Sequence, residues 1–205
     1  MKHEWRKKEK HIYLPKDKPE LIELPTFKYI TIKGQGNPNN IDFARHVQTL
    51  YSIAYGIRMS YKWDNPPKGY YEYTVYPLEG FWDLIDHSKY VPGQVDKDNL
   101  KYEIMLRQPD FLDQNLFDQV LEVVKKKKTD LDYNLVELKD ISEGLCVQMM
   151  HKGSYESEPQ SFSLMEKYAK ENGYERQSMV HKEIYLKDPK KTEPNKLQTV
   201  LRFKV

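Results

Sequence analysis

Cysteine and long apolar segments are scarce in this sequence. Among its 205 residues there is one cysteine, Cys146, so no internal disulfide can form. Proteins of reducing compartments rarely use disulfides, and we therefore expect a cytoplasmic location. No apolar run approaches the roughly 20 residues that cross a bilayer. The basic residues 1–10 are not followed by the apolar stretch of a secretory signal. We expect neither a leader nor a membrane partner.

An excess of one charge is also missing. The chain has 33 basic and 31 acidic side chains, for a net charge of +2. This near balance gives no support for nucleic acid as a partner. Two local basic runs, 6–10 and 125–128, fit a solvated tail and the end of a helix, where cations meet the negative end of the helix dipole.

The motifs of several common chemistries are absent from the sequence. The six histidines have no paired metal-ligand spacing. Gly34 and Gly36 lack the third glycine of a dinucleotide-binding fingerprint, and there is neither a Walker loop nor a nucleophile elbow. Cys146 lies in an alternating segment without a nearby base, which is typical of a buried structural thiol. We therefore expect no metal and no cofactor.

Tyrosine is the residue type that stands out. The chain contains 16 Tyr, 7 Phe and 3 Trp. Aromatic side chains favour the pleated, half-buried surface of a strand. Tyrosine also combines an apolar ring with a polar tip, which suits the lining of a ligand cavity. The composition is consistent with both explanations.

Hydrophobic periodicity predicts an α+β fold. The strands expected from alternation are 26–33, 71–78, 100–107, 143–152, 178–186 and 197–205. The helices expected from apolar spacing are 41–61, 114–127 and a third that begins between 156 and 160 and ends near 172. Residues 1–20 are polar and lysine-rich, and we expect them to form a flexible lead-in to one domain that covers 21–205.

The order strand–helix–strand–strand occurs twice, over about 24–108 and about 136–205, with the helix 114–128 as a link. No helix fits between the second and third strands of either half, so these strands should form antiparallel hairpins. We expect two similar units in one antiparallel sheet, with helices on one face and a central ligand cleft. The excursion 83–99 is either a lid over this cleft or a simple loop.

One carboxylate is of interest in the fifth predicted strand. Because side chains alternate along a strand, Glu183 shares a face with His181 and Tyr185. If that face lines an aromatic cleft, Glu183 can bind a flat cation by charge pairing beside stacked rings, or act as a general base toward water. If the face is solvated, Glu183 pairs with a neighbouring lysine instead.

Several segments resemble GyrI-like small-molecule-binding domains. The shared features are Glu183-Ile-Tyr185-Leu-Lys-Asp188-Pro189, the terminal Leu-x-Thr-x-Leu strand, Pro77-Leu-Glu-Gly-Phe-Trp82, and the strands that end at Gly34 and Gly153. The resemblance extends from about Leu24 to Val205. Because no DNA-binding helix pair is present, the chain is similar to the stand-alone form rather than to effector-binding domains fused to AraC- or MerR-type regulators.

The resemblance implies a duplicated fold, of the SOUL type, around a cleft for lipophilic, often cationic aromatic compounds, as in multidrug binding. By position, the glutamate that the family uses is Glu183, next to the aromatic residues Tyr185 and Trp82. Further ligand-binding candidates are Phe81, Tyr71 and Tyr155.

Three functions follow from these observations. We expect first a protein that senses or sequesters lipophilic cationic aromatic molecules. The second is a hydrolase of strained, cyclopropane-type toxins, as the resemblance implies for some relatives, with Glu183 as the base and Tyr185 as a hydrogen-bond donor. The third is a regulator of a protein partner. The sequence leaves the ligand and the oligomeric state open.

Overall fold

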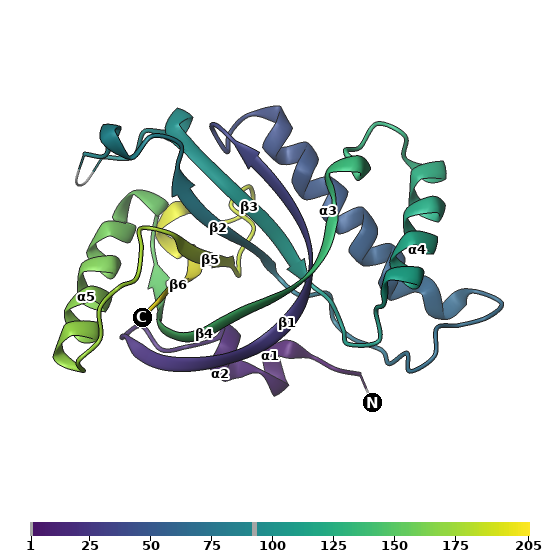
Figure 1. Ribbon diagram of the computed structural model, residues 1–205, viewed down its shortest axis with the longest axis horizontal. Helices are drawn as coiled ribbons and strands as arrows, with labels where there is room; N and C mark the ends of the chain where they lie inside the picture. The colour runs from purple at the N-terminus through teal and green to yellow at the C-terminus, as the bar shows by residue number, and fades with distance from the viewer. Residues whose placement is uncertain (1, 92–93) are drawn as a thin grey trace.

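The structure, a computed structural model that describes residues 2–91 and 94–205, contains a closed antiparallel barrel (Figure 1). The strand order around the barrel is β1-β3-β2-β5-β6-β4, and every neighbouring pair is antiparallel. The strands are β1 (Glu20–Gln35), β2 (Leu78–Leu84), β3 (Leu100–Arg107), β4 (Glu137–Lys152), β5 (His181–Tyr185) and β6 (Gln198–Lys204).

Helices cover the barrel from three sides. They are α1 (Trp5–Lys8), α2 (Lys10–Tyr13), α3 (Ile41–Met59), α4 (Gln114–Lys127) and α5 (Glu158–Glu171). Helix α3 packs on β1 and β3 and is covered by α4, whereas α5 packs on β4. The short helices α1 and α2 lie at the end of the barrel beneath β1 and β4 (Figure 1). Within the described residues, no helix has the length and apolar character needed to span a membrane.

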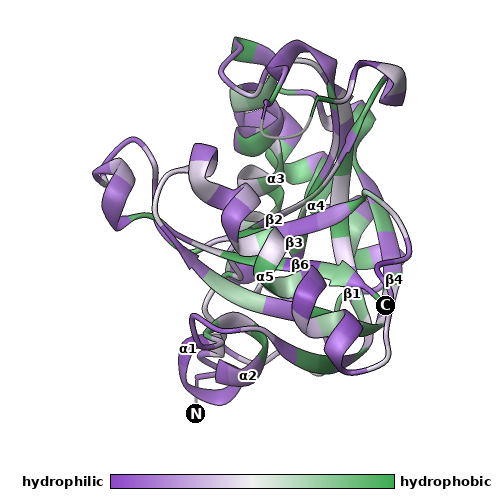
Figure 2. Cartoon of the chain, turned by 90° about the vertical axis from the view of Figure 1, so that its left-hand side faces the viewer, coloured by the Kyte–Doolittle hydropathy of each residue, from purple (hydrophilic) through white to green (hydrophobic). Residues whose placement is uncertain are grey.

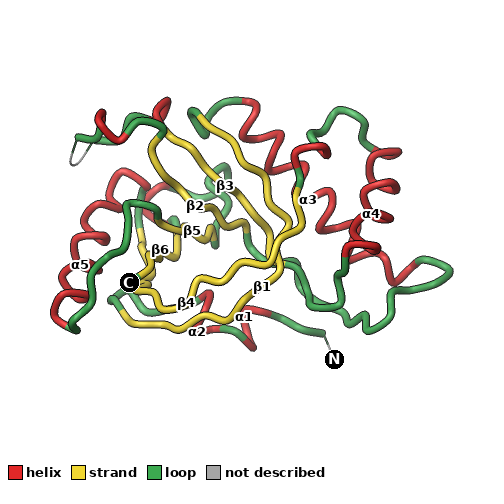
Figure 3. Tube along the Cα trace, viewed as in Figure 1, coloured by secondary structure: helices red, strands yellow, loops and turns green. Residues whose placement is uncertain are grey.

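The predicted α+β class and the antiparallel pairing are confirmed. The element order is β1-α3-β2-β3, then α4, then β4-α5-β5-β6. The sheet closes instead of staying open with helices on one face. Closure follows from β1 and β4, which are 16 residues each. They pair from Glu20–Gln148 to Thr31–Glu137, while β1 also pairs with β3 and β4 with β6 (Figure 3).

The strand predicted over 71–78 is wrong, because β2 begins only at Leu78. Tyr73 and Tyr76 are buried in an aromatic cluster. The backbone around Tyr73 pairs with His3, whose N–H donates to the carbonyl of Glu72 at 2.7 Å. The alternating tyrosines therefore reflect packing against the N-terminal segment, and Pro77, which has no N–H to donate, precedes the true strand.

The N-terminal residues are not the free lead-in that the sequence predicts. Trp5, Ile12 and Tyr13 are buried in the same cluster as Leu24 and Tyr76. The indole of Trp5 donates a hydrogen bond to the carbonyl of Val75 at 3.0 Å. Helices α1 and α2 thus cover one end of the barrel with apolar side chains. In the sequence, the many lysines around these side chains made the segment look solvated.

Side chains alternate along each strand, so that they face two different environments. Green, hydrophobic residues recur along the strands in Figure 2. One set of side chains faces the helices and forms apolar cores with α3 and α4, and with α5. The other set faces the barrel interior, where Cys146 is fully buried. Burial raises the pKa of the Cys146 thiol to about 11, which fits the predicted structural thiol.

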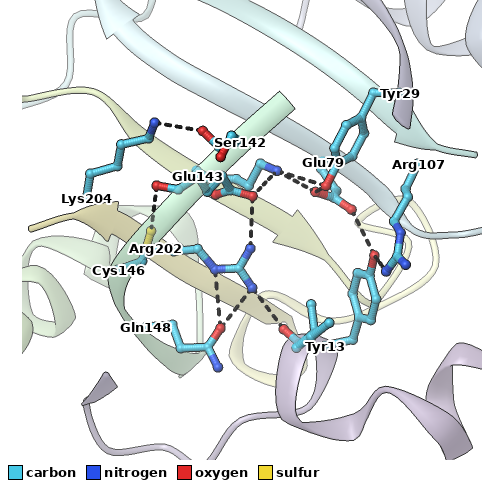
Figure 4. A network of polar contacts seen from close by, with 12 residues as sticks. Tyr13, Tyr29, Glu79, Arg107, Ser142, Glu143, Cys146, Gln148, Arg202 and Lys204 are labelled. Atoms are coloured by element: carbon cyan, nitrogen blue, oxygen red, sulfur yellow. Dashed lines mark hydrogen bonds and ion pairs between the residues drawn. The ribbon is translucent and has the colours of Figure 1, made fainter. Parts of the chain in front are cut away.

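The barrel interior also contains an ion network (Figure 4). Nζ of Lys182 donates to Glu79 at 2.8 Å and to Glu143 at 2.7 Å. Arg202 donates to Gln148 at 2.8 Å. Because buried charges are tolerated only when they are paired and hydrogen-bonded, these contacts account for Lys182 being only 1% exposed.

Candidate functional site

Five side chains gather on the helix-facing side of β2 and β5, and we call them the Glu183 cluster. In the register of these strands, Trp82 lies opposite His181 and Gly80 opposite Glu183. The cluster consists of Trp82, Tyr155, Glu158, Glu183 and Tyr185. Its flanks are the rings of Phe43 from α3, 5.9 Å from that of Trp82, and Phe162 from α5, 4.7 Å from that of His181.

Glycine at position 80 makes room for the indole of Trp82. A Cβ atom at Gly80 would lie 3.2 Å from Nε1 of Trp82 and 3.3 Å from Cγ2 of Ile104. Trp82 is 5% exposed. Its Nε1 donates a hydrogen bond to the hydroxyl of Tyr185 at 2.7 Å. The Gly-Phe-Trp sequence therefore sets an indole N–H beside the residues of β5.

Tyr185 connects the indole to the carboxylate. Burial raises the pKa of the Tyr185 phenol well above its ordinary value, and the negative charge of Glu183 raises it further. The hydroxyl remains protonated and accepts a hydrogen bond from Trp82, and the carboxylate of Glu183 is near enough to raise its pKa. The ring of Tyr155 meets that of Tyr185 edge-on, with centroids 6.2 Å apart.

Glu183 itself is 8% exposed. Its Oε1 lies 3.2 Å from Nε2 of His181, the neighbour that alternation predicts on the same face. Lys182 points the opposite way, into the barrel, and is not the solvent partner that the alternative reading of the sequence considered. Glu183 is therefore a nearly buried carboxylate among aromatic rings.

Glu158 is a member of the cluster that sequence reasoning missed. It is the first residue of α5, is 7% exposed, and its Oε1 has no hydrogen-bond partner among the described residues. Burial raises the pKa of Glu158 well above its ordinary value, and the charge of Glu183 adds to this effect. In the sequence, an acidic residue before Pro159 signals only a helix start, and solvation is its usual state.

Two predicted site residues lie elsewhere. Phe81 faces the barrel interior, where Nζ of Lys182 is 4.9 Å from its ring centroid. Tyr71 packs edge-on against Phe111, with centroids 5.4 Å apart, near the N-terminal helices. The inward orientation of Phe81 is explained by strand alternation, because the next residue, Trp82, faces the helices. Tyr71 was placed by the parity of a strand that does not exist.

A small cavity of about 50 Å³ opens on the interior side of β5. Its lining includes Phe81, Lys182, Arg202 and Lys204. This volume suits a water-sized group and is too small for an aromatic ligand. Among the described residues, no group of three or more His, Cys, Asp or Glu side chains is arranged to hold a metal ion. The side chains of the Glu183 cluster present carboxyl, hydroxyl and aromatic groups.

Comparison with known proteins gives consistent results. A family model described as a GyrI-like small molecule binding domain matches residues 17–205. A hydrolase from Listeria innocua is 36% identical over 98% of both chains, with a TM-score of 0.89. An uncharacterized conserved protein from the same organism is 37% identical over 98% of both chains, with a TM-score of 0.90.

More distant structures share the fold alone. The C-terminal domain of EcmrR is 16% identical, with a TM-score of 0.52 over 92% of this chain and 98% of that domain. No curated protein matches the chain.

Proposed function

The chain belongs to the GyrI-like small-molecule-binding family, and from that premise we propose that it binds a lipophilic, cationic aromatic molecule at the Glu183 cluster. The biological role would be to sense or sequester a drug or toxin in the cytoplasm. The observation that supports this proposal most directly is the chain of contacts from Trp82 through Tyr185 to Glu183.

The physical argument rests on charge and burial. A carboxylate that is 8% exposed gains from a nearby positive charge, because it has lost most of its hydration. Aromatic rings attract cations through their electron-rich faces. A flat cation that stacks against Trp82 or Tyr155 would place its charge beside Glu183. We expect the half-buried rings of Tyr155 and Tyr185 to move and admit such a ligand.

We propose further that the two strand–helix–strand–strand units arose by duplication and that the ligand cleft lies at their seam. The supporting observation is that β2 of the first unit supplies Trp82, while β5 of the second supplies Glu183 and Tyr185. The flanking rings also come from both units, Phe43 from α3 and Phe162 from α5.

Titration with rhodamine 6G, a fluorescent lipophilic cation, tests the binding proposal. We expect Glu183→Gln to weaken binding by about tenfold or more, which corresponds to about 1.4 kcal/mol of lost charge pairing. The matched control is Glu175→Gln, an exposed glutamate that should bind as the wild type does. Equal affinity of wild type and Glu183→Gln would contradict a role for the carboxylate in binding.

A second candidate function is hydrolysis of a strained electrophile, and the pair of carboxyl groups favours it. Glu183 would take a proton from water as the water oxygen bonds to the strained ring carbon. The electron pair of the broken ring bond would pass to a conjugated carbonyl oxygen of the substrate, which Tyr185 would stabilise by hydrogen bonding. Glu183 would then return its proton to the product, which completes the addition of water. The description of the 36% identical Listeria innocua protein as a hydrolase is consistent with this proposal.

Turnover distinguishes hydrolysis from binding. With a cyclopropane-bearing alkylating agent in excess, an enzyme forms many equivalents of ring-opened product, whereas a binding protein forms none beyond the uncatalysed rate. We expect Glu183→Gln to reduce turnover by about 10²–10⁴-fold, as for loss of a general base. Product formation that stays below one equivalent of protein would rule out the enzyme.

A further inference from the structure

Two carboxyl groups from separate elements meet in the Glu183 cluster. Glu158 belongs to the first turn of α5 and Glu183 to β5, and both are more than nine-tenths buried. Oε1 of Glu158 has no hydrogen-bond partner among the described residues. A buried carboxyl oxygen without a partner costs free energy, so the position favours a group that can supply a positive charge or a proton.

The two carboxyl groups cannot easily be charged together. In a site of low polarity, one negative charge opposes the ionisation of a second carboxyl nearby. Burial raises the pKa of Glu158, and the charge of Glu183 raises it further. Without a ligand, the protonated form of Glu158 is therefore favoured.

The groups around Glu158 include no lysine or arginine that would stabilise its ionised form, among the described residues. The titratable neighbours are His181 and Tyr185 from β5, and Tyr155 and Glu156 from the turn before α5. His151 from β4 is hydrogen-bonded to Ser157 and Ser161. Among the described residues, neither carboxyl is ion-paired with a lysine or an arginine, since Lys97 reaches only Glu156. Apart from His181, which lies 3.2 Å from Glu183, positive charge must come from outside the cluster.

We propose that the Glu158–Glu183 pair exchanges a proton for positive charge on the ligand, and that it prefers an aromatic dication over a monocation with the same ring system. This inference rests on the proposed binding function. The O–H bond of Glu158 breaks, the proton passes to the solvent, and the new carboxylate pairs with the second cationic group. A monocation satisfies Glu183 and leaves the proton on Glu158.

Ethidium and propidium provide matched probes, because they share a phenanthridinium ring and carry one and two positive charges. Calorimetric titration at pH 7 in phosphate and in Tris, whose ionisation enthalpies differ, counts the protons released. We expect the wild type to release close to one proton with propidium and fewer with ethidium. Propidium affinity should rise by up to tenfold per pH unit, since each bound dication displaces one proton.

Variants identify the source of the proton. Glu158→Gln should bind both dyes without proton release and lose most of the preference for propidium, whereas Glu158→Asp should retain both. Glu175→Gln, the same change at an exposed carboxylate outside the cluster, should behave as the wild type does. Circular dichroism checks that each variant is folded.

Three results would overturn the inference. Wild-type binding of propidium with the same enthalpy in both buffers would exclude proton exchange while leaving the proposed function intact. Release that persists in Glu158→Gln but disappears in His181→Gln would assign the proton to the histidine. Failure of the wild type to bind either dye would contradict both the inference and the proposed binding function.

Discussion

At the residue scale, Glu158 lies where a carboxylate is disfavoured, and its effect on stability should depend on pH. Above the ordinary pKa of glutamate, the unfolded chain has lost a proton that the folded chain keeps, because burial and Glu183 raise the pKa of Glu158. The free energy of unfolding therefore falls as pH rises between these two pKa values. The loss is complete once pH exceeds the raised value.

Glu158→Gln should remove this pH dependence. We expect urea unfolding at pH 7 to give a variant more stable than the wild type by roughly 1–3 kcal/mol, the range for a buried polar group without a partner. At pH 4 the two proteins should be nearly equal. Glu175→Gln, at an exposed glutamate, is the control with no such gain. A stability change that is the same at both pH values would refute the assignment.

At the element scale, β2 depends on glycine at position 80. Gly80→Ala would place a methyl group 3.2–3.3 Å from the indole of Trp82 and from Ile104, closer than side chains ordinarily pack. We expect destabilisation of about 1–3 kcal/mol, as for an overpacked core. We also expect altered Trp82 fluorescence, because the indole must move away from Tyr185.

Gly36→Ala provides a contrast for this prediction. Gly36 has a positive φ of 94° but nothing within 4 Å of its added Cβ, so its substitution strains the backbone and leaves the cluster untouched. Unfolding curves and Trp82 emission of both variants test the difference. Unchanged emission in Gly80→Ala would show that the indole does not depend on this glycine.

The helices and strands also show which sequence patterns are sufficient to predict structure. The strand at 100–107 and the helix at 114–127 were predicted with their observed bounds, since their apolar periods are clear and lysines end the helix. Alternation placed His181, Glu183 and Tyr185 on one face, as observed. These are local properties, and the sequence reports them directly.

Contacts between residues far apart in the chain could not be predicted from the sequence. Tyr73 alternates with polar residues as a strand residue would, but its partner is the N-terminal segment. Glu158 reads as an ordinary helix start, and only the packing of α5 beside β5 buries it. Lys182 reads as a solvated lysine, although two glutamates from β2 and β4 hold it in the interior.

At the scale of the whole molecule, Lys182 joins strands from both units through Glu79 and Glu143. Burial alone would raise the pKa of Glu143, but the charges of Lys182 and Arg202 outweigh it and hold that pKa below its ordinary value. The resulting stabilisation is present at neutral pH and is lost as pH falls through the lowered pKa in the folded state.

Lys182→Met should leave two buried carboxylates without their shared cation. We expect a loss of about 3–5 kcal/mol at pH 7.5, as for breaking a buried ion pair from one side. The loss should shrink at pH 4, where protonation relieves the carboxylates. Urea unfolding at both pH values measures it, with Lys167→Met, an exposed lysine, as the control. A loss that is equal at both pH values would contradict the electrostatic explanation.

The hydrogen bond from Arg202 to the carbonyl of Ile12 joins residues 190 positions apart at a distance of 3.0 Å. During synthesis, α2 emerges early but cannot complete its contacts until β6 has left the ribosome. Trp5, Ile12 and Tyr13 stay without their full burial over that interval. Contacts of such sequence separation also slow folding. Until β6 has been made, the nascent chain therefore exposes these three apolar side chains to aggregation and proteolysis.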